Sequence, residues 1–257
     1  MSTNRWMKNC ENEVKNIAVV GGTHGNELHG IYLASDINSY PKGRELKEMY
    51  PSLSVVGVLG NIVATAAIGT GAGRRYCEED LNRCFLLQDL ADPSLCSIER
   101  LRARELDALL GPKSSTNPIT DLILDFHSTT SNTGFLMCCH PQDKFGLQLV
   151  AHLQSKYPYI SASLWADCEM PLLPTIARSG ITVEVGPISH STSNSALYQE
   201  TRRILHDALS YIELHNQWIS QKNVPCPEKR RLCIQSTKMR LFERFATIGF
   251  PRNSAGM

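Results

Sequence analysis

Long hydrophobic segments and a surplus of charge of either sign are both missing from this 257-residue sequence. No apolar run approaches the ~20 residues that cross a bilayer, and the polar start, residues 1–15, contains no hydrophobic stretch typical of a secretory signal. The 26 basic and 25 acidic residues nearly cancel, so no strong field attracts nucleic acid or anionic lipid. We therefore expect no nucleic acid partner, no membrane partner and a cytoplasmic location.

Paired cysteines at metal-binding spacing are also absent. The sequence has nine cysteines, an odd number, and contains no CxxC pair, which argues against a zinc cluster held by thiolates. In the expected absence of an export signal, we predict reduced thiols rather than a disulfide framework. There are no internal repeats, and the chain is long enough for one large core, alone or with a small appendage.

Five short apolar runs rich in β-branched residues indicate β-strands. They are bounded by turn residues such as glycine and proline, and their continuous apolar character is typical of strands covered on both faces of a sheet. The predicted strands are Asn16–Gly21, Leu53–Leu59, Asp121–Phe126, Gly134–Cys139 and Ile181–Val185.

Three further segments carry apolar residues at helical spacing, and we predict helices over Glu27–Asn38, Ile98–Leu110 and Ser193–Ile219. The second of these stops at a glycine–proline pair, which is a good signal for the end of a helix. Because strands and helices alternate, the pattern predicts an α/β sandwich. The residues expected to be buried are Leu28, Ile31 and Tyr32 in the first helix and Ile98, Leu101, Leu106 and Leu109 in the second.

The loop after the first predicted strand, residues 21–27, contains a histidine and a glutamate three positions apart. If a helix begins near Glu27, the side chains of His24 and Glu27 can converge on one point. His127 directly follows a predicted strand, and α/β folds place their sites at strand ends. A catalytic Zn²⁺ needs three protein ligands and one open position, so we predict one zinc per chain on these residues. Purely structural roles for the two histidines remain the alternative.

Four motifs are present in chain order, GGTHGNE (21–27), RRYCEEDLNRCF (74–85), DFHSTTSNTG (125–134) and VEVGP (183–187). Together they resemble the aspartoacylase family, which includes amidohydrolases that prefer N-acyl aromatic amino acids and is related to the zinc carboxypeptidases. The resemblance implies a three-layer α/β/α sandwich with a mixed central sheet, and His24, Glu27 and His127 as zinc ligands. It also implies hydrolysis of a small N-acyl amino acid to a carboxylate and a free amino acid.

The resemblance implies that Glu184 is the carboxylate that activates the attacking water. The predicted strand agrees with a special role, because Thr182 and Glu184 face one way while the apolar residues between and beside them face the other. A carboxylate inside a strand is costly to bury without a partner. A structural salt bridge is the alternative, and a base with a raised pKa is the functional interpretation.

The second motif implies a substrate-binding segment. By resemblance, Asn82 and Arg83 hold the α-carboxylate of the substrate, which suits the bidentate geometry of a guanidinium group. Arg75 is implied to polarise the scissile carbonyl and to stabilise its developing negative charge. Asp80 is expected to brace the loop or a metal ligand without binding the metal itself.

Three departures from the family pattern affect the expected specificity and activity. An arginine that reads an acidic side chain in aspartoacylase is replaced here by Pro174, and a nearby tyrosine position holds Met170. We therefore favour N-acyl aromatic or other neutral amino acids over N-acetylaspartate. Ser128 stands where the family usually has asparagine, a mild change because serine can still donate a hydrogen bond. The third departure concerns residues 221–257.

The predicted catalytic domain spans residues 1–220, and residues 221–257 are expected to be the remnant of a β-rich domain that covers the cleft in the family. A chain lacking most of that domain is expected to keep its metal site but to turn over slowly, because water is less well excluded. Three alternatives remain, namely a zinc carboxypeptidase, a desuccinylase of N-succinylglutamate type, and an impaired isoform that only binds zinc. An exposed cleft edge also makes a homo-oligomer possible.

Overall fold

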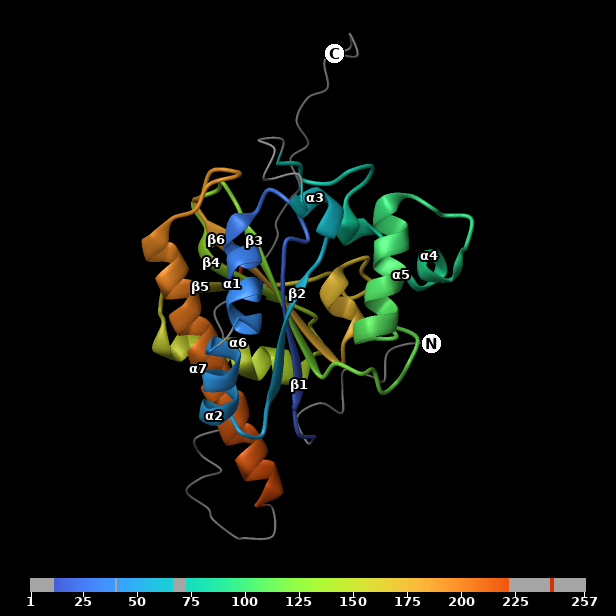
Figure 1. Cartoon of the computed structure of the whole chain (residues 1–257). Helices are drawn as coiled ribbons and strands as arrows, with labels where there is room; N and C mark the ends of the chain where they lie inside the picture. The colour runs from blue at the N-terminus through green and yellow to red at the C-terminus, as the bar shows by residue number, and fades with distance from the viewer. Residues whose placement is uncertain (1–11, 40, 67–72, 222–240, 243–257) are drawn as a thin grey trace.

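A seven-stranded mixed sheet forms the centre of the computed structural model, which describes residues 12–39, 41–66, 73–221 and 241–242 (Figure 1). The strand order is β2-β1-β3-β6-β4-β5-β7, and among these strands only the β4–β6 pair is antiparallel. The predicted α/β fold with a mixed sheet is therefore confirmed.

All five predicted strands are present, with ends that differ by no more than a few residues. Two strands were not predicted, Ile160–Leu164 and Leu241–Phe242. Serines interrupt the apolar pattern of the first, and no strand was assigned within residues 221–257, where the second lies. The strands are β1 (Asn16–Gly21), β2 (Ser54–Leu59), β3 (Leu122–Ser128), β4 (Gly134–Cys139), β5 (Ile160–Leu164), β6 (Ser179–Gly186) and β7 (Leu241–Phe242).

The three predicted helices are confirmed as α1 (Leu28–Asn38), α5 (Ile98–Leu110) and α7 (Ser195–Ser220). Among the helices missed, Lys144–Lys156 is as long as α5, and its N-cap is Asp143, whose side chain accepts the Gly146 N–H. The other elements are α2 (Lys42–Met49), α3 (Ile62–Ala66), α4 (Leu87–Ala91), α6 (Lys144–Lys156), and the short 3-10 helices η3 (Leu81–Arg83) and η4 (Leu173–Ile176).

Helices cover the sheet on both faces and so complete the three layers. One large apolar cluster joins α1, α2, α6 and α7 to the sheet, and a second cluster joins α5, η3 and η4 to the opposite face. Alternation along β1 divides the strand between them, since Ile17 and Val19 lie in the first cluster and Ala18 and Val20 in the second. Figure 1 shows α1, α2 and α7 on one side and α5 with α4 on the other.

Two predicted buried faces were partly wrong. Tyr32 of α1 is 47% exposed, and Leu101 and Leu109 of α5 are about half exposed. In α5 the buried residues are Glu99, Ala103, Leu106 and Leu110. The prediction failed because the buried face of this helix includes a glutamate and an alanine, which an apolar pattern cannot select.

Helix α1 lies unusually close to the sheet, which fixes the start of the helix beside the strand ends. A Cβ atom on Gly21 would come within 1.9 Å of the Gly30 carbonyl oxygen, and one on Gly30 would come within 2.4 Å of the Phe126 carbonyl oxygen. Only glycine permits such backbone contact. Gly22 also has φ +70, a conformation that glycine adopts without strain. Glu27, directly before α1, is thereby held against β3.

The free edge of β2 is partly closed by side chains. The amide of Asn38 donates to the Gly57 carbonyl and accepts from its N–H, at 2.7 and 2.9 Å. Arg102 donates to the carbonyls of Leu59 and Gly60 at 2.8 Å each. These contacts occupy backbone groups that would otherwise be available for pairing with another strand.

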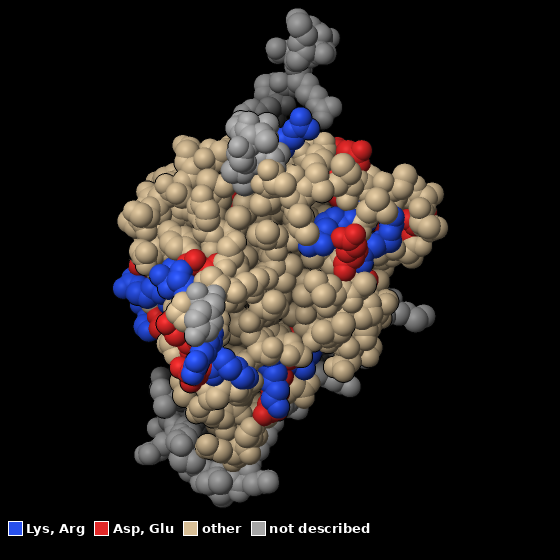
Figure 2. All heavy atoms as spheres, in the orientation of Figure 1, with Lys and Arg blue, Asp and Glu red and all other residues tan. Residues whose placement is uncertain are grey.

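The surface in Figure 2 carries acidic and basic side chains next to each other, over α2 and α7 and over α4 and α5. No described helix has the length and apolar character needed to cross a membrane. The six described cysteines are free thiols. The predicted division at residue 220 stays a prediction, because residues 222–240 and 243–257 lie outside the described part.

Candidate metal centre

The candidate site lies at the carboxyl ends of three neighbouring parallel strands, β1, β3 and β6. The loop after β1 carries His24 and Glu27. His127 was expected just after its strand, but it lies within β3, directly opposite Glu184 of β6 in the register. Three segments distant in the sequence therefore meet at one edge of the sheet.

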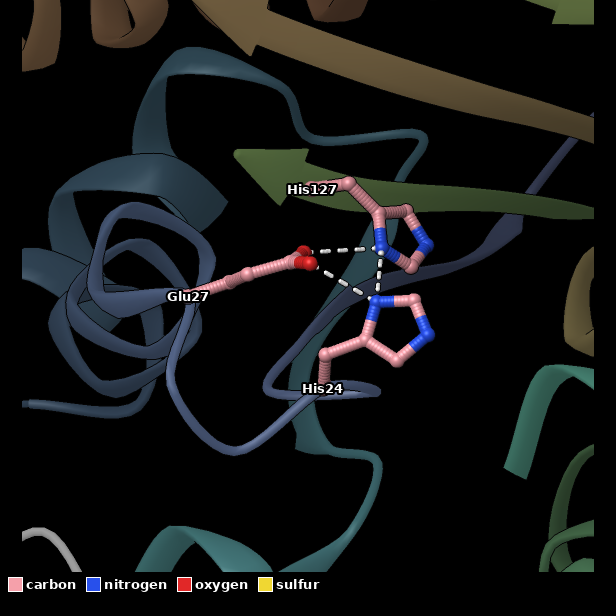
Figure 3. Close-up of side chains that lie close together, drawn as sticks. All are labelled: His24, Glu27 and His127. Carbon is pink, nitrogen blue, oxygen red and sulfur yellow. Dashed lines mark hydrogen bonds and ion pairs between the residues drawn. The ribbon is translucent and has the colours of Figure 1, made fainter. Parts of the chain in front are cut away.

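His24, Glu27 and His127 point toward one another and are all buried, as Figure 3 shows. The imidazole ring centroids lie 4.8 Å apart. His24 Nδ1 is 2.8 Å from Glu27 Oε1, and His127 Nδ1 is 2.9 Å from Glu27 Oε2. The two Nδ1 atoms are 3.1 Å apart. The three residues that the sequence proposed as metal ligands thus form one compact group.

The Nε2 atom of each imidazole is within hydrogen-bond distance of a second carboxylate. His24 Nε2 lies 3.0 Å from Asp80 Oδ1, and His127 Nε2 lies 2.9 Å from Asp125 Oδ2. Asp125 is itself fixed by the Thr23 hydroxyl, which donates to it at 2.7 Å. A carboxylate that accepts the Nε2–H leaves the Nδ1 lone pair free for a metal ion and fixes the ring orientation.

The position of Asp80 agrees with its predicted role as a brace. Asp125 was missed, although a signal for it exists in the sequence. It is the one charged residue inside an apolar strand, and it lies two positions before His127. Alternation puts both side chains on the same face of β3.

The electrostatics of the group favour a cation. Burial opposes ionisation of Glu27, but His127 and His24 outweigh it and lower the pKa of the carboxyl well below its usual range. Burial would also lower the pKa of His127, but the carboxylates of Asp125 and Glu27 raise it well above its ordinary value. Carboxylates thus surround the two imidazoles, and a bound divalent ion would balance their charge.

The donor set also fits a metal ion in its geometry. Two imidazole nitrogens and a carboxylate are ligands that suit zinc. Ligand atoms at about 2.0–2.1 Å from a tetrahedral ion lie roughly 3.4 Å from one another. The donor atoms here are separated by 2.8–3.1 Å, so a small opening of the group would suffice. Each imidazole already has its supporting carboxylate.

Glu184 lies beside this group on the same face of the sheet. Strand β6 alternates as predicted, with Ile181, Val183 and Val185 in the large apolar cluster and Glu184 on the opposite face. Burial raises the pKa of Glu184 above its usual value. No lysine or arginine pairs with it in the described part of the chain, so the structural salt bridge gains no support.

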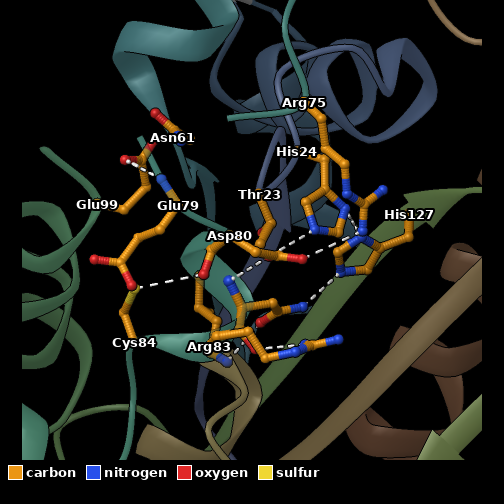
Figure 4. Close-up of polar contacts among 12 residues, drawn as sticks. Thr23, His24, Asn61, Arg75, Glu79, Asp80, Arg83, Cys84, Glu99 and His127 are labelled. Carbon is orange, nitrogen blue, oxygen red and sulfur yellow. Dashed lines mark hydrogen bonds and ion pairs between the residues drawn. The ribbon is translucent and has the colours of Figure 1, made fainter. Parts of the chain in front are cut away.

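The proposed substrate residues lie beside the metal group, where Figure 4 shows Arg75 and Arg83, and Asn82 precedes Arg83 in η3. Arg75 donates to Glu27 Oε1 at 3.2 Å and reaches Asp80 at 3.5 Å. Asn82 is buried, and its Oδ1 accepts the Leu173 N–H at 2.9 Å. Arg83 is exposed and donates to the Asn82 carbonyl. Among the described residues, Arg83 forms no ion pair, so its guanidinium group is available for an anion.

A buried His–Glu–His group at the carboxyl ends of strands in a mixed α/β sheet defines a protein with a site that could hold a metal ion. A family model described as the succinylglutamate desuccinylase/aspartoacylase catalytic domain matches residues 13–212. The chain belongs to this family. The match covers every residue of the candidate site.

Individual relatives agree with this assignment. A Nostoc protein named "Probable aspartoacylase" is 31% identical over 246 residues, which cover 95% of this chain and 76% of the relative. An N-acyl-aromatic-L-amino acid amidohydrolase (carboxylate-forming) from Rattus norvegicus is 34% identical, covering 93% and 70%. The crystal structure of murine aminoacylase 3 superposes with a TM-score of 0.70 at 35% identity, covering 80% of this chain and 67% of that one.

Proposed function

We propose that this protein is a zinc-dependent amidohydrolase that converts N-acyl-L-amino acids to a carboxylate and a free amino acid. The observation that carries the proposal is the buried group of His24, Glu27 and His127 with Glu184 beside it. The named activities of the relatives, aspartoacylase and N-acyl-aromatic amino acid amidohydrolase, supply the class of substrate.

His24, Glu27 and His127 would hold the ion, with Asp80 and Asp125 keeping the two imidazoles in orientation. When bound, zinc supplies Lewis acidity, which polarises the acyl carbonyl and makes water a stronger acid. Because the three side chains are almost completely buried, they act in surroundings of low polarity, where charge interactions are stronger than in water.

Glu184 would move the proton in this reaction. It accepts a proton from the attacking water and then donates it to the nitrogen of the leaving amine. Its raised pKa suits both steps, because a carboxyl group that titrates closer to neutral pH can alternate between base and acid. The absence of a described basic partner leaves the carboxylate free for this role.

Arg83 and Asn82 would hold the α-carboxylate of the substrate, and Arg75 would stabilise the negative charge that develops on the acyl oxygen. The exposed, unpaired guanidinium group of Arg83 supports its part. Arg75 reaches Glu27 and therefore borders the metal group directly. Asn82 is engaged by the Leu173 backbone, so a role in positioning Arg83 fits this residue as well as direct contact.

A neutral amino acid side chain is the preferred substrate feature in this proposal. Pro174 is buried in η4 and carries no charge. The arginine nearest to Pro174 in the sequence is Arg178. It pairs with Asp121 at 3.0 Å, at the amino-terminal end of β3 and away from the metal group. On the side of β4, away from His127, the neighbours of Glu184 are uncharged, namely Leu136 and Cys138.

A hydrolysis screen with metal control tests the proposal. The panel holds N-acetyl-L-tyrosine, N-acetyl-L-phenylalanine, N-acetyl-L-aspartate, N-succinyl-L-glutamate and a short unblocked peptide. We expect the two aromatic substrates to be cleaved fastest, the activity to disappear with a chelator, and zinc to restore it. Cleavage of the peptide alone would contradict the proposal in favour of a carboxypeptidase. Bound zinc without hydrolysis of any substrate would contradict the enzymatic assignment.

A further inference from the structure

Glu99 is a fully buried carboxylate in the first turn of α5, with 0% exposure. Its Oε1 accepts the Cys77 N–H at 2.6 Å and the Asn61 side-chain amide at 2.9 Å. Its Oε2 accepts the N–H groups of Glu78 and Glu79 at 3.1 and 3.3 Å. Among the described residues, no lysine or arginine pairs with Glu99, so these amide donors alone stabilise its charge.

The three consecutive backbone N–H groups form a concave anion-binding nest, and Glu99 fills it from within the chain. Side chains of the loop also accept hydrogen bonds from residues at the start of α5. Glu78 accepts the Ile98 N–H at 2.6 Å, and Glu79 accepts the Ser97 hydroxyl at 2.5 Å. The loop and the helix start are therefore locked together in both directions.

Residues 77–79, whose N–H groups bind Glu99, lie between the residues that face the metal group. Arg75 precedes this segment by two positions and Asp80 follows it directly. The Arg75 carbonyl accepts the Gly25 N–H at 3.0 Å, next to His24. Asn61 extends the connection, since its own N–H donates to the Gly22 carbonyl at 2.8 Å. A continuous series of hydrogen bonds thus runs from α5 to the metal-binding loop, as part of Figure 4 shows.

We propose that Glu99 is a positioning residue for catalysis, which holds the loop at 77–79 so that Arg75, Asp80 and Arg83 meet the metal group and the substrate. This inference rests on the proposed function for its catalytic consequence. Glu99 does not touch the metal ligands or the space beside Glu184. Its effect passes through the backbone of the loop.

The carboxylate is needed in this place because every group around it is a donor. Glutamine keeps the length of the side chain but offers one acceptor oxygen, and its amide N–H groups would face backbone N–H groups. The loop must then shift or leave donors unpaired. Misplacement of catalytic groups by about 1 Å can reduce rates by ~10²-fold. We expect Glu99→Gln to lower kcat/KM by about 10–100-fold. The value of kcat should fall because Arg75 is displaced, and KM should rise because Arg83 is displaced.

The test compares Glu99→Gln with two variants on the same helix. Glu105→Gln makes the same chemical change at an exposed position, where the side chain pairs with Arg102. Leu106→Ala removes a buried side chain from the core under α5 and lowers stability, while the hydrogen bonds between Glu99 and the loop stay in place. Melting temperature, kcat and KM are measured for each variant well below its melting temperature, with kcat expressed per bound metal ion.

We expect both Glu99→Gln and Leu106→Ala to melt earlier, but only Glu99→Gln to change kcat and KM together. Wild-type kcat and KM in Glu99→Gln would overturn the inference. An equal loss of kcat/KM in Leu106→Ala would also overturn it, because a merely structural effect would then explain the data.

A second measurement does not depend on catalysis. Arg74 and Arg75 lie just before the loop, Arg83 lies after it in η3, and all three are exposed. Trypsin cleavage after these residues therefore reports how firmly the segment is held. We expect several-fold faster cleavage in Glu99→Gln than in wild type or Leu106→Ala. If wild type cleaves no N-acyl amino acid, the proposed function fails while the trypsin result still judges the anchoring. Unchanged cleavage in an active enzyme with normal kcat and KM overturns the inference alone.

Discussion

The two faces of the sheet differ in the side chains that β3 and β6 place on them. Toward α1, α6 and α7, strands β3 and β6 present an unbroken apolar set that includes Leu124 and Val183. Toward α5, the alternate positions of β3 and β6 hold Asp125, His127 and Glu184, all buried or largely buried. One face gains its free energy from apolar burial, whereas the other keeps buried charge that must be balanced.

The two-residue period of a strand thus places the residues that stabilise the fold and the residues proposed for the chemistry on opposite faces. Neighbouring residues such as Phe126 and His127 have opposite surroundings. Substitutions on the apolar face should therefore cost folding free energy and spare activity. Substitutions of the polar residues Asp125, His127 and Glu184 on the other face should do the reverse.

The largest expected effect is the loss of turnover in Glu184→Gln. Removal of the proposed acid and base should lower kcat by about 10²–10⁴-fold. The melting temperature should stay the same or rise, because a buried carboxylate without a basic partner is removed. Steady-state kinetics and thermal unfolding measure the two quantities.

Glu213→Gln on α7 is a matched control for that variant. Glu213 is also buried, but it accepts the Ser52 N–H and hydroxyl on the apolar side of the sheet. The Glu213→Gln variant should have a lower melting temperature than wild type and an unchanged kcat. If Glu184→Gln retained wild-type kcat, the assignment of the polar face to catalysis would be wrong.

On the apolar face, Leu209→Ala should cost about 2–5 kcal/mol of unfolding free energy. Leu209 is fully buried in α7, within the large cluster. Because the substitution leaves the metal group untouched, kcat and KM should stay within about twofold of wild type under conditions where the protein is folded. Denaturant unfolding measures the first quantity, and a loss of metal on this substitution would break the proposed separation.

Asp125→Asn should weaken metal binding or activity by about 10–100-fold. Asparagine keeps the size of the side chain but orients the His127 imidazole less strongly. Asp121→Asn is the control, since it makes the same change at the other end of β3, where Asp121 pairs with Arg178. Titration with zinc under competition from a chelator measures both variants. Equal zinc affinity in wild type and Asp125→Asn would show that Asp125 does not support the metal ligand.

The smallest expected effect concerns acid stability. Burial would raise the pKa of Glu99, but hydrogen bonds from Cys77, Asn61, Glu78 and Glu79 lower it below 4.5. A lowered folded-state pKa gives stability that is present above the unfolded value and is lost as pH falls through the folded value. The melting temperatures of wild type and Glu99→Gln should therefore differ most above pH 4.5 and converge in stronger acid. A constant difference across that range would contradict this.

The sequence predicted the parts of the fold that rest on long apolar runs. It found β1, β2, β3, β4 and β6 because their residues are largely apolar on one or both faces. It missed β5, where Ser161 and Ser163 alternate with apolar residues over only five positions. It misplaced the buried face of α5, because Glu99 and Ala103 lie inward while Leu101 lies outward. Tertiary contacts decide such cases, and local patterns do not contain them.

The sequence predicted that His24, Glu27 and His127 come together, and the roles assigned to them stay predictions. His24 and Glu27 are three residues apart, and His127 lies at a strand end, so elementary geometry brings them together. The supporting residues were harder to find. Asp125 could have been recognised as a lone charge in an apolar strand, whereas Glu99 acts on a loop twenty residues earlier in the chain. Nothing in its local sequence indicates that contact.

The most direct test of the central claim is X-ray absorption at the zinc edge of the purified, zinc-loaded protein. We expect two imidazole nitrogens and carboxylate or water oxygens at about 2.0–2.2 Å from the ion, with no sulfur shell at about 2.3 Å. His127→Ala should lose one imidazole from the spectrum or lose the ion. A sulfur shell, or an unchanged spectrum in His127→Ala, would show that zinc binds elsewhere and would contradict the account.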